Sequence, residues 1–223
     1  MQQSSGSINK LDCFYDDQHN ILKIRFIDLP SDTSWENYYY ENGHVVYKIR
    51  LYKGTQGDTI HYIFNSGKYI EVDQYGHIHK YIYNNLGQLI KIERHEGSKV
   101  TDYSDYFYDM NGNCIKCTEY TEQNYSDSIY IPMIMTDFEF GAQKNPYSSI
   151  GLPPLNSMGS EVGQYLSPNN ITKIRTHFIT DSINFVFLYK YSSFNDNGYP
   201  LSFSITDTLN HVASIENIQY ICP

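Results

Sequence analysis

The sequence predicts an all-β protein: a single long antiparallel meander of hairpins, strongly twisted or curled toward a half-barrel. Tyrosine supplies 23 of 223 residues, and aromatic residues together make up 16%; such side chains favour strands. Alanine occurs only at Ala142 and Ala213, which argues against a helical bundle. A short hairpin-like pattern also recurs along the chain, which indicates repeated units stacked in series.

The repeated pattern is an aromatic residue, Asn or Asp, a short polar turn that usually contains Gly, and then aliphatic residues leading to Lys. It occurs at 15–23, 83–91 and 108–116, in a tighter form at 40–46 and 64–70, and in a longer form at 191–198. Asn and Asp close turns with their side chains, and Gly supplies positive φ. The flanks alternate with period two. Each unit therefore predicts a hairpin that needs neighbours to bury one face.

The pattern breaks after Phe140. Residues 141–170 contain four prolines and four glycines, which predicts an irregular loop segment with a short helix near 157–166. Strand character resumes at Ile171 and continues to Ile221. We therefore expect one β domain over 9–223 that contains this segment, preceded by a flexible polar leader at 1–8.

Charge and hydropathy exclude several classes of partner. The net charge is −9, the isoelectric point is near 5.3, and Lys and Arg are scattered singly. An acidic chain without a basic patch is not expected to bind nucleic acid or anionic lipid. No apolar run approaches the ~18 residues of a membrane-spanning helix, so no membrane-spanning segment is expected.

The segments Tyr83–Ile92 and Tyr108–Asn113 resemble the YD repeats of bacterial cell-surface proteins. Followed by Lys144–Tyr147 (KNPY), Ser167–Ile171 (SPNNI) and Asn197–Pro200 (NGYP), they resemble a narrower family, the Bacteroidetes envelope lipoproteins of unknown function with a porin-like antiparallel sheet. The resemblance covers about Leu11 to Tyr220. It implies an exported, cell-envelope protein, outer-membrane-anchored or periplasmic, with its lipid anchor upstream of Met1. It implies no activity and no residue roles.

The four cysteines, Cys13, Cys114, Cys117 and Cys222, are too few for a disulfide scaffold. Cys114 and Cys117 have the spacing of redox and zinc sites. Their surroundings predict a strand, however, where positions i and i+3 face opposite sides. We therefore expect buried, inert thiols there, and a Cys13–Cys222 disulfide stays open.

Other reactive side chains lack supporting partners. His77 and His79 share a strand face but have no third ligand at a suitable spacing, and Asp137 and Glu139 share a face as a carboxylate pair. No nucleophile or phosphate-binding motif is present. We therefore expect no catalytic residue, no metal site and no cofactor.

The tyrosines are expected to be mainly structural, with packed rings and hydroxyls in water. Three aromatic residues stand outside the repeat and are the candidate ligand-binding residues: Trp35, Tyr39 and Tyr147. Strand alternation sends Tyr39 to the face opposite Tyr38 and Tyr40, and Tyr147 lies in the irregular segment.

Three functions remain open. The first is a non-enzymatic protein that binds a glycan, a peptide or an unknown envelope protein through sheet-face aromatics or the 141–170 segment. The second is a structural or assembly component of the envelope. The third is a hydrolase of envelope polymers, which requires two carboxylates ~5–10 Å apart in a cleft.

Overall fold

The computed structural model describes residues 10–15, 17, 21–28, 32–52, 55–66, 68–74, 77–123, 129–145, 160–209 and 212–217. The leader expected at 1–8 and the candidate Tyr147 lie outside these residues.

Fifteen strands form one sheet whose spatial order is the chain order, and every neighbouring pair described is antiparallel. The strands are β1 Lys10–Tyr15, β2 Ile21–Asp28, β3 Asp32–Glu41, β4 His44–Tyr52, β5 Thr55–Asn65, β6 Lys68–Gln74, β7 His77–Tyr83, β8 Leu89–Glu96, β9 Lys99–Tyr108, β10 Cys114–Glu122, β11 Tyr130–Lys144, β12 Asn169–Phe178, β13 Ile183–Phe194, β14 Pro200–Asp207 and β15 Val212–Asn217. The predicted all-β meander is confirmed.

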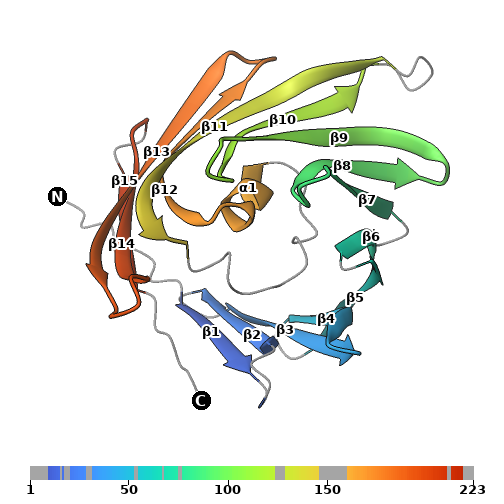
Figure 1. Cartoon of the computed structure of the whole chain (residues 1–223), viewed down its shortest axis with the longest axis horizontal. Coiled ribbons are helices and arrows are strands. Elements are labelled where there is room, and N and C mark those ends of the chain that lie inside the picture. Colours follow the sequence, from blue (N-terminus) through green and yellow to red (C-terminus); the bar gives the residue numbers. More distant parts are fainter. Residues whose placement is uncertain are drawn as a thin grey trace.

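The sheet is strongly curved. In Figure 1 the ribbon bends around the short helix α1, Ser160–Leu166, with β1 at one end and β14 and β15 at the other. In the described part of the chain, β1 and β15 are the two edge strands, so the sheet is open. Strand twist accumulated over so many strands gives this curvature.

The core lies on the concave face. Along β7 the side chains alternate, with His79 and Tyr81 buried and Lys80 and Ile82 exposed. Antiparallel register carries the buried face from strand to strand, and the buried cluster includes Val162 of α1. A Cβ added at Gly163 would stand 2.7 Å from the Phe138 ring, so the helix packs closely against the concave side of β11.

Three hairpin turns share one geometry. In each, an Asn or Asp side-chain oxygen accepts hydrogen bonds from the backbone N–H groups two and four residues further on, and a Gly three residues on has φ between 81° and 84°. The turns begin at Asn84, Asp109 and Asn195, and their glycines are Gly87, Gly112 and Gly198. This shared geometry is the physical basis of the repeated sequence pattern.

Tyrosines at or near the ends of three strands tether neighbouring strands together. The hydroxyl of each donates to a backbone carbonyl near the start of the adjacent strand: Tyr83 to Tyr69 at 2.9 Å, Tyr108 to Leu89 at 2.7 Å and Tyr191 to Ile171 at 2.8 Å. The expectation that the hydroxyls lie in water is wrong for these residues. Burial raises the pKa of Tyr83 to about 12, since a buried phenolate would lose its hydration.

The residues before and after the undescribed stretch 146–159 are held together. The backbone N–H of Asn145 donates to the Pro168 carbonyl at 2.9 Å, and its side-chain amide donates to the Ser167 carbonyl at 2.8 Å. The Ser167 hydroxyl in turn accepts from the backbone N–H of Cys114 and donates to the Gly163 carbonyl. The Asn-Pro and Ser-Pro segments noted in the sequence therefore meet in space.

The segment between β11 and β12 is shorter than the 141–170 expected from the sequence. Strand β11 continues to Lys144, and β12 starts at Asn169. The short helix expected near 157–166 is present as α1, which starts at Ser160.

The two central cysteines face the same side, which corrects the expectation that they face opposite sides. Cys114 lies opposite Tyr108 and Cys117 opposite Tyr106, because a register shift between Cys114 and Lys116 adds one residue to β10. Both thiols are free and fully buried. Burial raises the pKa of Cys114 to about 12 and that of Cys117 further, so both remain inert thiols. Cys222 lies outside the described residues, which leaves its pairing with Cys13 open.

A buried ionic cluster, which the sequence analysis did not predict, links β3 to β4 on the concave face. One oxygen of Glu36 accepts from Lys48 at 2.9 Å and from Arg50 at 2.7 Å, and the other accepts from the Tyr38 hydroxyl at 2.6 Å. Lys48 is fully buried and Glu36 is nearly so. Burial raises the pKa of Glu36, but the Lys48 ammonium and these hydrogen bonds outweigh it, so the net pKa is lowered. The pair is tolerated because its polar atoms are satisfied.

Candidate functional site

Trp35 and Tyr39 both lie on the convex face of β3. Tyr38 between them is buried on the other face, whereas the Tyr39 side chain is 38% exposed. The predicted alternation at this cluster is therefore what the structure shows. Trp35 and Tyr39 do not contact each other, because their backbone positions are four residues, or about 13 Å, apart along the strand.

Tyr39 belongs to a row of rings across three strands. Its ring stacks on that of Tyr47 with 4.3 Å between centroids, and the Tyr47 ring lies 6.0 Å from that of His61. The register places these residues directly opposite one another on β3, β4 and β5. We call Tyr39, Tyr47 and His61 the aromatic strip. Stacking covers one face of each tyrosine ring. Tyr39 and His61 are exposed and Tyr47 is half-buried, so the strip reaches solvent mainly at Tyr39 and His61.

Trp35 is in a different situation. The Lys23 ammonium lies 3.4 Å from the centroid of its ring, and the Phe14 ring lies 6.1 Å away and tilted. The cation occupies one face of the indole. Trp35 is half-buried, whereas Tyr39 is exposed.

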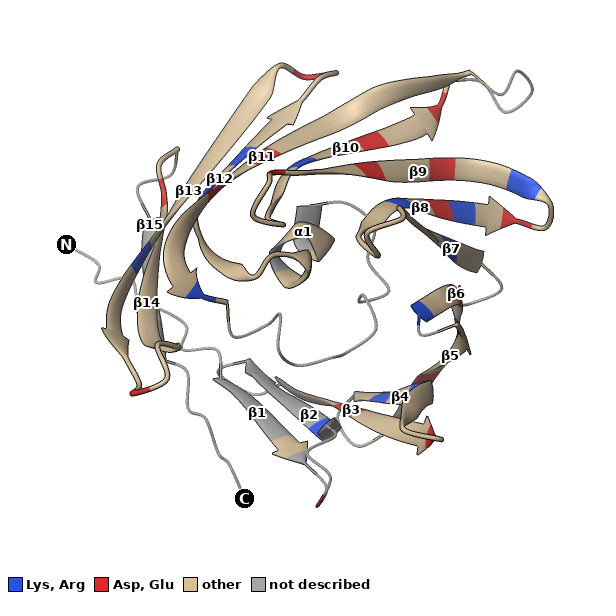
Figure 2. Cartoon of the chain, viewed as in Figure 1, with Lys and Arg blue, Asp and Glu red and all other residues tan. Residues whose placement is uncertain are grey.

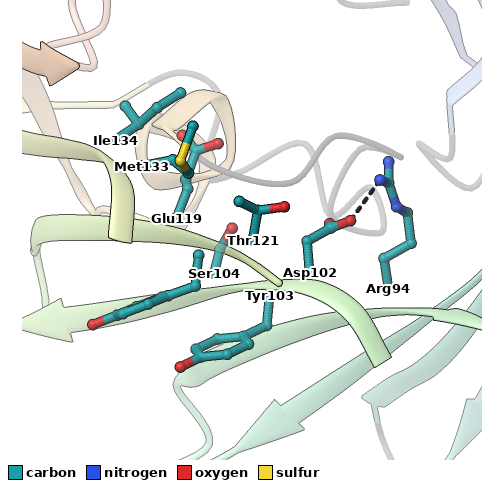
Figure 3. Close-up of a pocket in the computed structure, with 9 residues that line it drawn as sticks. Arg94, Asp102, Tyr103, Ser104, Glu119, Thr121, Met133 and Ile134 are labelled. Carbon is teal, nitrogen blue, oxygen red and sulfur yellow. Dashed lines mark ion pairs between the residues drawn. The ribbon is translucent and has the colours of Figure 1, made fainter. Parts of the chain in front are cut away.

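A second feature, the concave pocket, was not predicted. It has a volume of about 190 Å³ and lies over β8 to β11 (Figure 3). Its polar side chains are Arg94, Asp102, Ser104, Glu119 and Thr121, and Met133 and Ile134 add apolar wall. One sequence signal could have found it: the concave positions of β9 and β10 change from Tyr and Cys near the Asp109 turn to Asp, Ser, Glu and Thr further away.

The pocket and α1 occupy different parts of the concave face. The helix follows the β9–β10 turn side of the sheet, where Ser167 bonds to Cys114. The pocket lies toward the opposite ends of the strands, since Arg94 is close to the end of β8 and Asp102 close to the start of β9. The concave face is therefore not covered by the helix at the pocket.

Charge is concentrated around the pocket. Figure 2 shows acidic and basic residues interleaved along β8 and β9. Inside the pocket, Arg94 forms an ion pair with Asp102 at 2.5 Å, and the same carboxylate accepts from the Thr101 hydroxyl at 3.1 Å. Burial raises the pKa of Asp102, and the nearby Arg94 guanidinium only partly offsets this.

A second carboxylate, that of Glu119, lines the same pocket as Asp102. Asp102 lies opposite Thr121 and Ser104 lies opposite Glu119. The two carboxylates therefore sit diagonally on adjacent strands, where backbone positions are roughly 7–8 Å apart. This backbone spacing is compatible with the carboxylate separation of ~5–10 Å that the hydrolase hypothesis requires.

The histidine pair also borders this region. His79 lies opposite Arg94 on β8 and is buried, and His77 lies 3.6 Å from the Glu96 carboxylate. Burial, with Arg94 and His77 nearby, lowers the pKa of His79 to about 4. Within the described ranges, no group of three or more His, Cys, Asp or Glu side chains is arranged to hold a metal.

Asp137 and Glu139, the carboxylate pair noted in the sequence, share an exposed face of β11. Glu139 forms an ion pair with Lys173 at 2.7 Å, and Asp137 lies opposite Arg175. They belong to a solvated ladder of alternating charge, and neither lines the concave pocket.

No protein-family model matches the chain, and no curated protein matches its sequence. Among solved structures, it is similar to a porin-like protein from Bacteroides vulgatus, with a TM-score of 0.58, 11% identity, and 98% of this chain and 99% of that chain covered. It is also similar to a porin-like protein from Bacteroides uniformis, with a TM-score of 0.56, 9% identity, and 96% and 90% covered.

A looser similarity is to the Photorhabdus luminescens Tc holotoxin pore, with a TM-score of 0.33, 16% identity, and 93% of this chain and 9% of that chain covered. A score this low supports no argument about the fold. Separately, none of the helical segments described has the length and apolar character needed to cross a membrane. The similarity in fold to the two Bacteroides proteins therefore lies in the all-antiparallel sheet.

Proposed function

We propose that the protein is a non-enzymatic, exported cell-envelope protein that binds a glycan through the aromatic strip. The observation that carries the proposal is the strip itself: three rings from three adjacent strands, in register, with the rings of Tyr39 and His61 exposed. The resemblance to Bacteroidetes envelope lipoproteins, together with the fold shared with porin-like Bacteroides proteins, supports the envelope setting.

The position of the strip favours a glycan over a peptide. An extended peptide gains most of its affinity by pairing with an edge strand, but the strip lies on β3 to β5, inside the sheet. A sugar needs only a flat apolar ring surface and a few polar groups at its edge. The face of the exposed Tyr39 ring that Tyr47 does not cover provides that surface, and the His61 nitrogens and the tyrosine hydroxyls provide the polar groups.

Tyr147 and the 141–170 segment remain a second predicted contact surface. The ends of this segment meet on the concave side, through Asn145 and Ser167. A partner bound there would lie across the sheet from the aromatic strip.

The proposal is tested by binding to a panel of bacterial envelope polysaccharides, comparing the wild-type protein with Tyr39→Ala. Loss of a stacked ring is expected to weaken binding about tenfold, which corresponds to ~1.4 kcal/mol. Phe107→Ala is the matched control, because Phe107 is also an exposed ring on the convex face, on β9, and lies outside both the strip and the concave pocket. Trp35→Ala is expected to have a smaller effect than Tyr39→Ala.

Equal weakening in Tyr39→Ala and Phe107→Ala would contradict a site at the strip. No binding to any polysaccharide in the panel would favour a structural or assembly component.

The hydrolase alternative is supported by the two pocket carboxylates and the raised pKa of Asp102. Against it, the Asp102 carboxylate is held by Arg94, and an acid engaged by a guanidinium is poorly placed to protonate a leaving group. The same polysaccharide incubations decide the matter: new reducing ends that disappear in Glu119→Gln would establish hydrolysis.

A further inference from the structure

The concave pocket contains a buried hydroxyl that has no partner among the described residues. Ser104 is fully buried, and its Oγ makes no hydrogen bond within that part of the chain. In Figure 3 this oxygen lies on the same side of the strands as Asp102 and Thr121, whereas the Tyr103 ring points to the other side. An unsatisfied buried hydroxyl costs about 1–3 kcal/mol, so a bound group that supplies the missing hydrogen bond would be stabilised there.

The size of the pocket limits what can bind. Its volume of about 190 Å³ corresponds to roughly six water molecules at ~30 Å³ each. This is below the ~300–1,000 Å³ of sites for drug-sized ligands. A ligand of one six-membered ring with its substituents fits this space, and an oligomer could enter with only one unit.

The polar side chains that line the pocket can bind a ligand that both donates and accepts hydrogen bonds. Asp102 and Glu119 offer acceptors and Arg94 offers donors, whereas the hydroxyls of Ser104 and Thr121 do both. Alcohol groups match this mixture. Met133 and Ile134 supply an apolar patch against which the C–H groups of a ring can pack.

The charges of the wall select against an anion. Two carboxylates face one guanidinium, and that guanidinium is already paired with Asp102. A ligand carboxylate or phosphate would therefore meet net negative charge in a partly desolvated space.

We propose that the concave pocket binds a single neutral sugar ring, whose hydroxyls bond to Ser104, Thr121 and the Arg94–Asp102 pair. This site lies on the face of the sheet opposite the aromatic strip, so it does not depend on the function proposed for the strip.

The experiment uses the full chain and saturation-transfer NMR with titration of methyl glucoside, methyl galactoside and methyl mannoside up to ~50 mM, a range suited to millimolar affinities. At least one neutral glycoside is expected to bind, and glucuronate is expected to bind at least about tenfold more weakly. Binding of none of the glycosides, or binding of glucuronate as tight as that of the glycosides, would overturn the proposal.

Two variants locate the site. Ser104→Ala and Thr121→Val each remove one hydroxyl and are expected to weaken glycoside binding about fivefold, the effect of one hydrogen bond. Thr136→Val is the matched control, since Thr136 is a buried threonine of the concave face bonded to Thr176, outside the pocket. Tyr39→Ala should leave glycoside binding in the pocket unchanged, which separates this site from the aromatic strip.

Stability provides an independent readout. Because the Ser104 hydroxyl has no described partner to lose, Ser104→Ala is expected to leave the unfolding midpoint of the ligand-free protein unchanged or higher. A clearly lower midpoint would show that the hydroxyl has an internal partner. That result, or glycoside binding unaffected in both pocket variants, would refute the assignment.

Discussion

At the scale of single residues, His79 shows how burial changes the chemistry of a side chain. On the sequence alone, His77 and His79 are two imidazoles on one strand face. In the structure His79 is buried opposite Arg94. Burial, with Arg94 and His77 nearby, lowers the pKa of His79 to about 4. The neutral imidazole is therefore the form that the fold accepts.

This shift predicts how stability depends on pH. The unfolded chain takes up a proton at the ordinary histidine pKa near 6.5, whereas folded His79 does not until pH approaches 4. The unfolded state thus binds more protons between these values, and stability falls as pH falls through this window. The loss attributable to His79 is at most about 3 kcal/mol.

The measurement is urea denaturation at pH 7.5 and pH 4.5. His79→Gln, which cannot titrate, is expected to lose less stability between these pH values than the wild-type protein. The control His61→Gln, on the exposed convex face, should keep the wild-type difference. If His79→Gln and the wild-type protein lose equal stability, the imidazole is protonated in the folded state.

At the scale of elements, the hairpin is the unit that the sequence encodes most directly. The Asp109 carboxylate accepts from the N–H groups of Asn111 and Asn113 at 2.9 and 2.8 Å and from the Asn113 side chain at 3.1 Å. All of these bonds lie within five residues, so the turn could be predicted before any tertiary contact is known. The equivalent turns at Asn84 and Asn195 repeat it.

Asp109→Ala removes these acceptors and is expected to destabilise the protein by about 1–2 kcal/mol, in line with other lost side-chain bonds to backbone N–H groups. Asp109→Asn keeps the oxygen that Asn84 and Asn195 use, so its cost should be below about 0.5 kcal/mol. Chemical denaturation at neutral pH compares the two variants. Similar losses in both would mean that the carboxylate charge, and not the acceptor geometry, holds the turn.

Strand faces were harder to predict than turns. Period-two alternation correctly separates Tyr38 from Tyr39, but it fails at Cys114 and Cys117, where a bulge in β10 turns both thiols inward. A bulge depends on how a turn joins the register of two strands. The residues of one strand therefore do not determine which face each side chain takes.

At the scale of the whole molecule, pairing is strictly sequential, so each strand depends chiefly on its two chain neighbours. In such an arrangement stability is close to a sum of local terms. The buried cluster of Glu36, Lys48 and Arg50 on β3 and β4 is remote in the sheet from β10 and β11, where α1 packs. A destabilising substitution in one part of the sheet is therefore expected to increase local unfolding mainly in the strands near it.

Glu36→Gln leaves the buried Lys48 without a counter-charge and is expected to cost about 3–5 kcal/mol. Hydrogen exchange should accelerate mainly in β2 to β5 and much less in β10 to β12. The control is Glu139→Gln, because Glu139 forms an exposed pair with Lys173 and should cost less than about 1 kcal/mol. Uniform acceleration over all strands would show that the sheet unfolds as one cooperative unit.

The sequence by itself determined the hairpins, their order and the all-β class, because turn closure and period-two patterning act over a few residues. Only the tertiary structure decided which polar residues share the concave pocket and which rings line up in the aromatic strip. Asp102 and Glu119 are 17 positions apart in the chain, and Tyr39 and His61 come from strands that are not adjacent. Their proximity depends on register, bulges and sheet curvature, which arise when all the strands pack around one core.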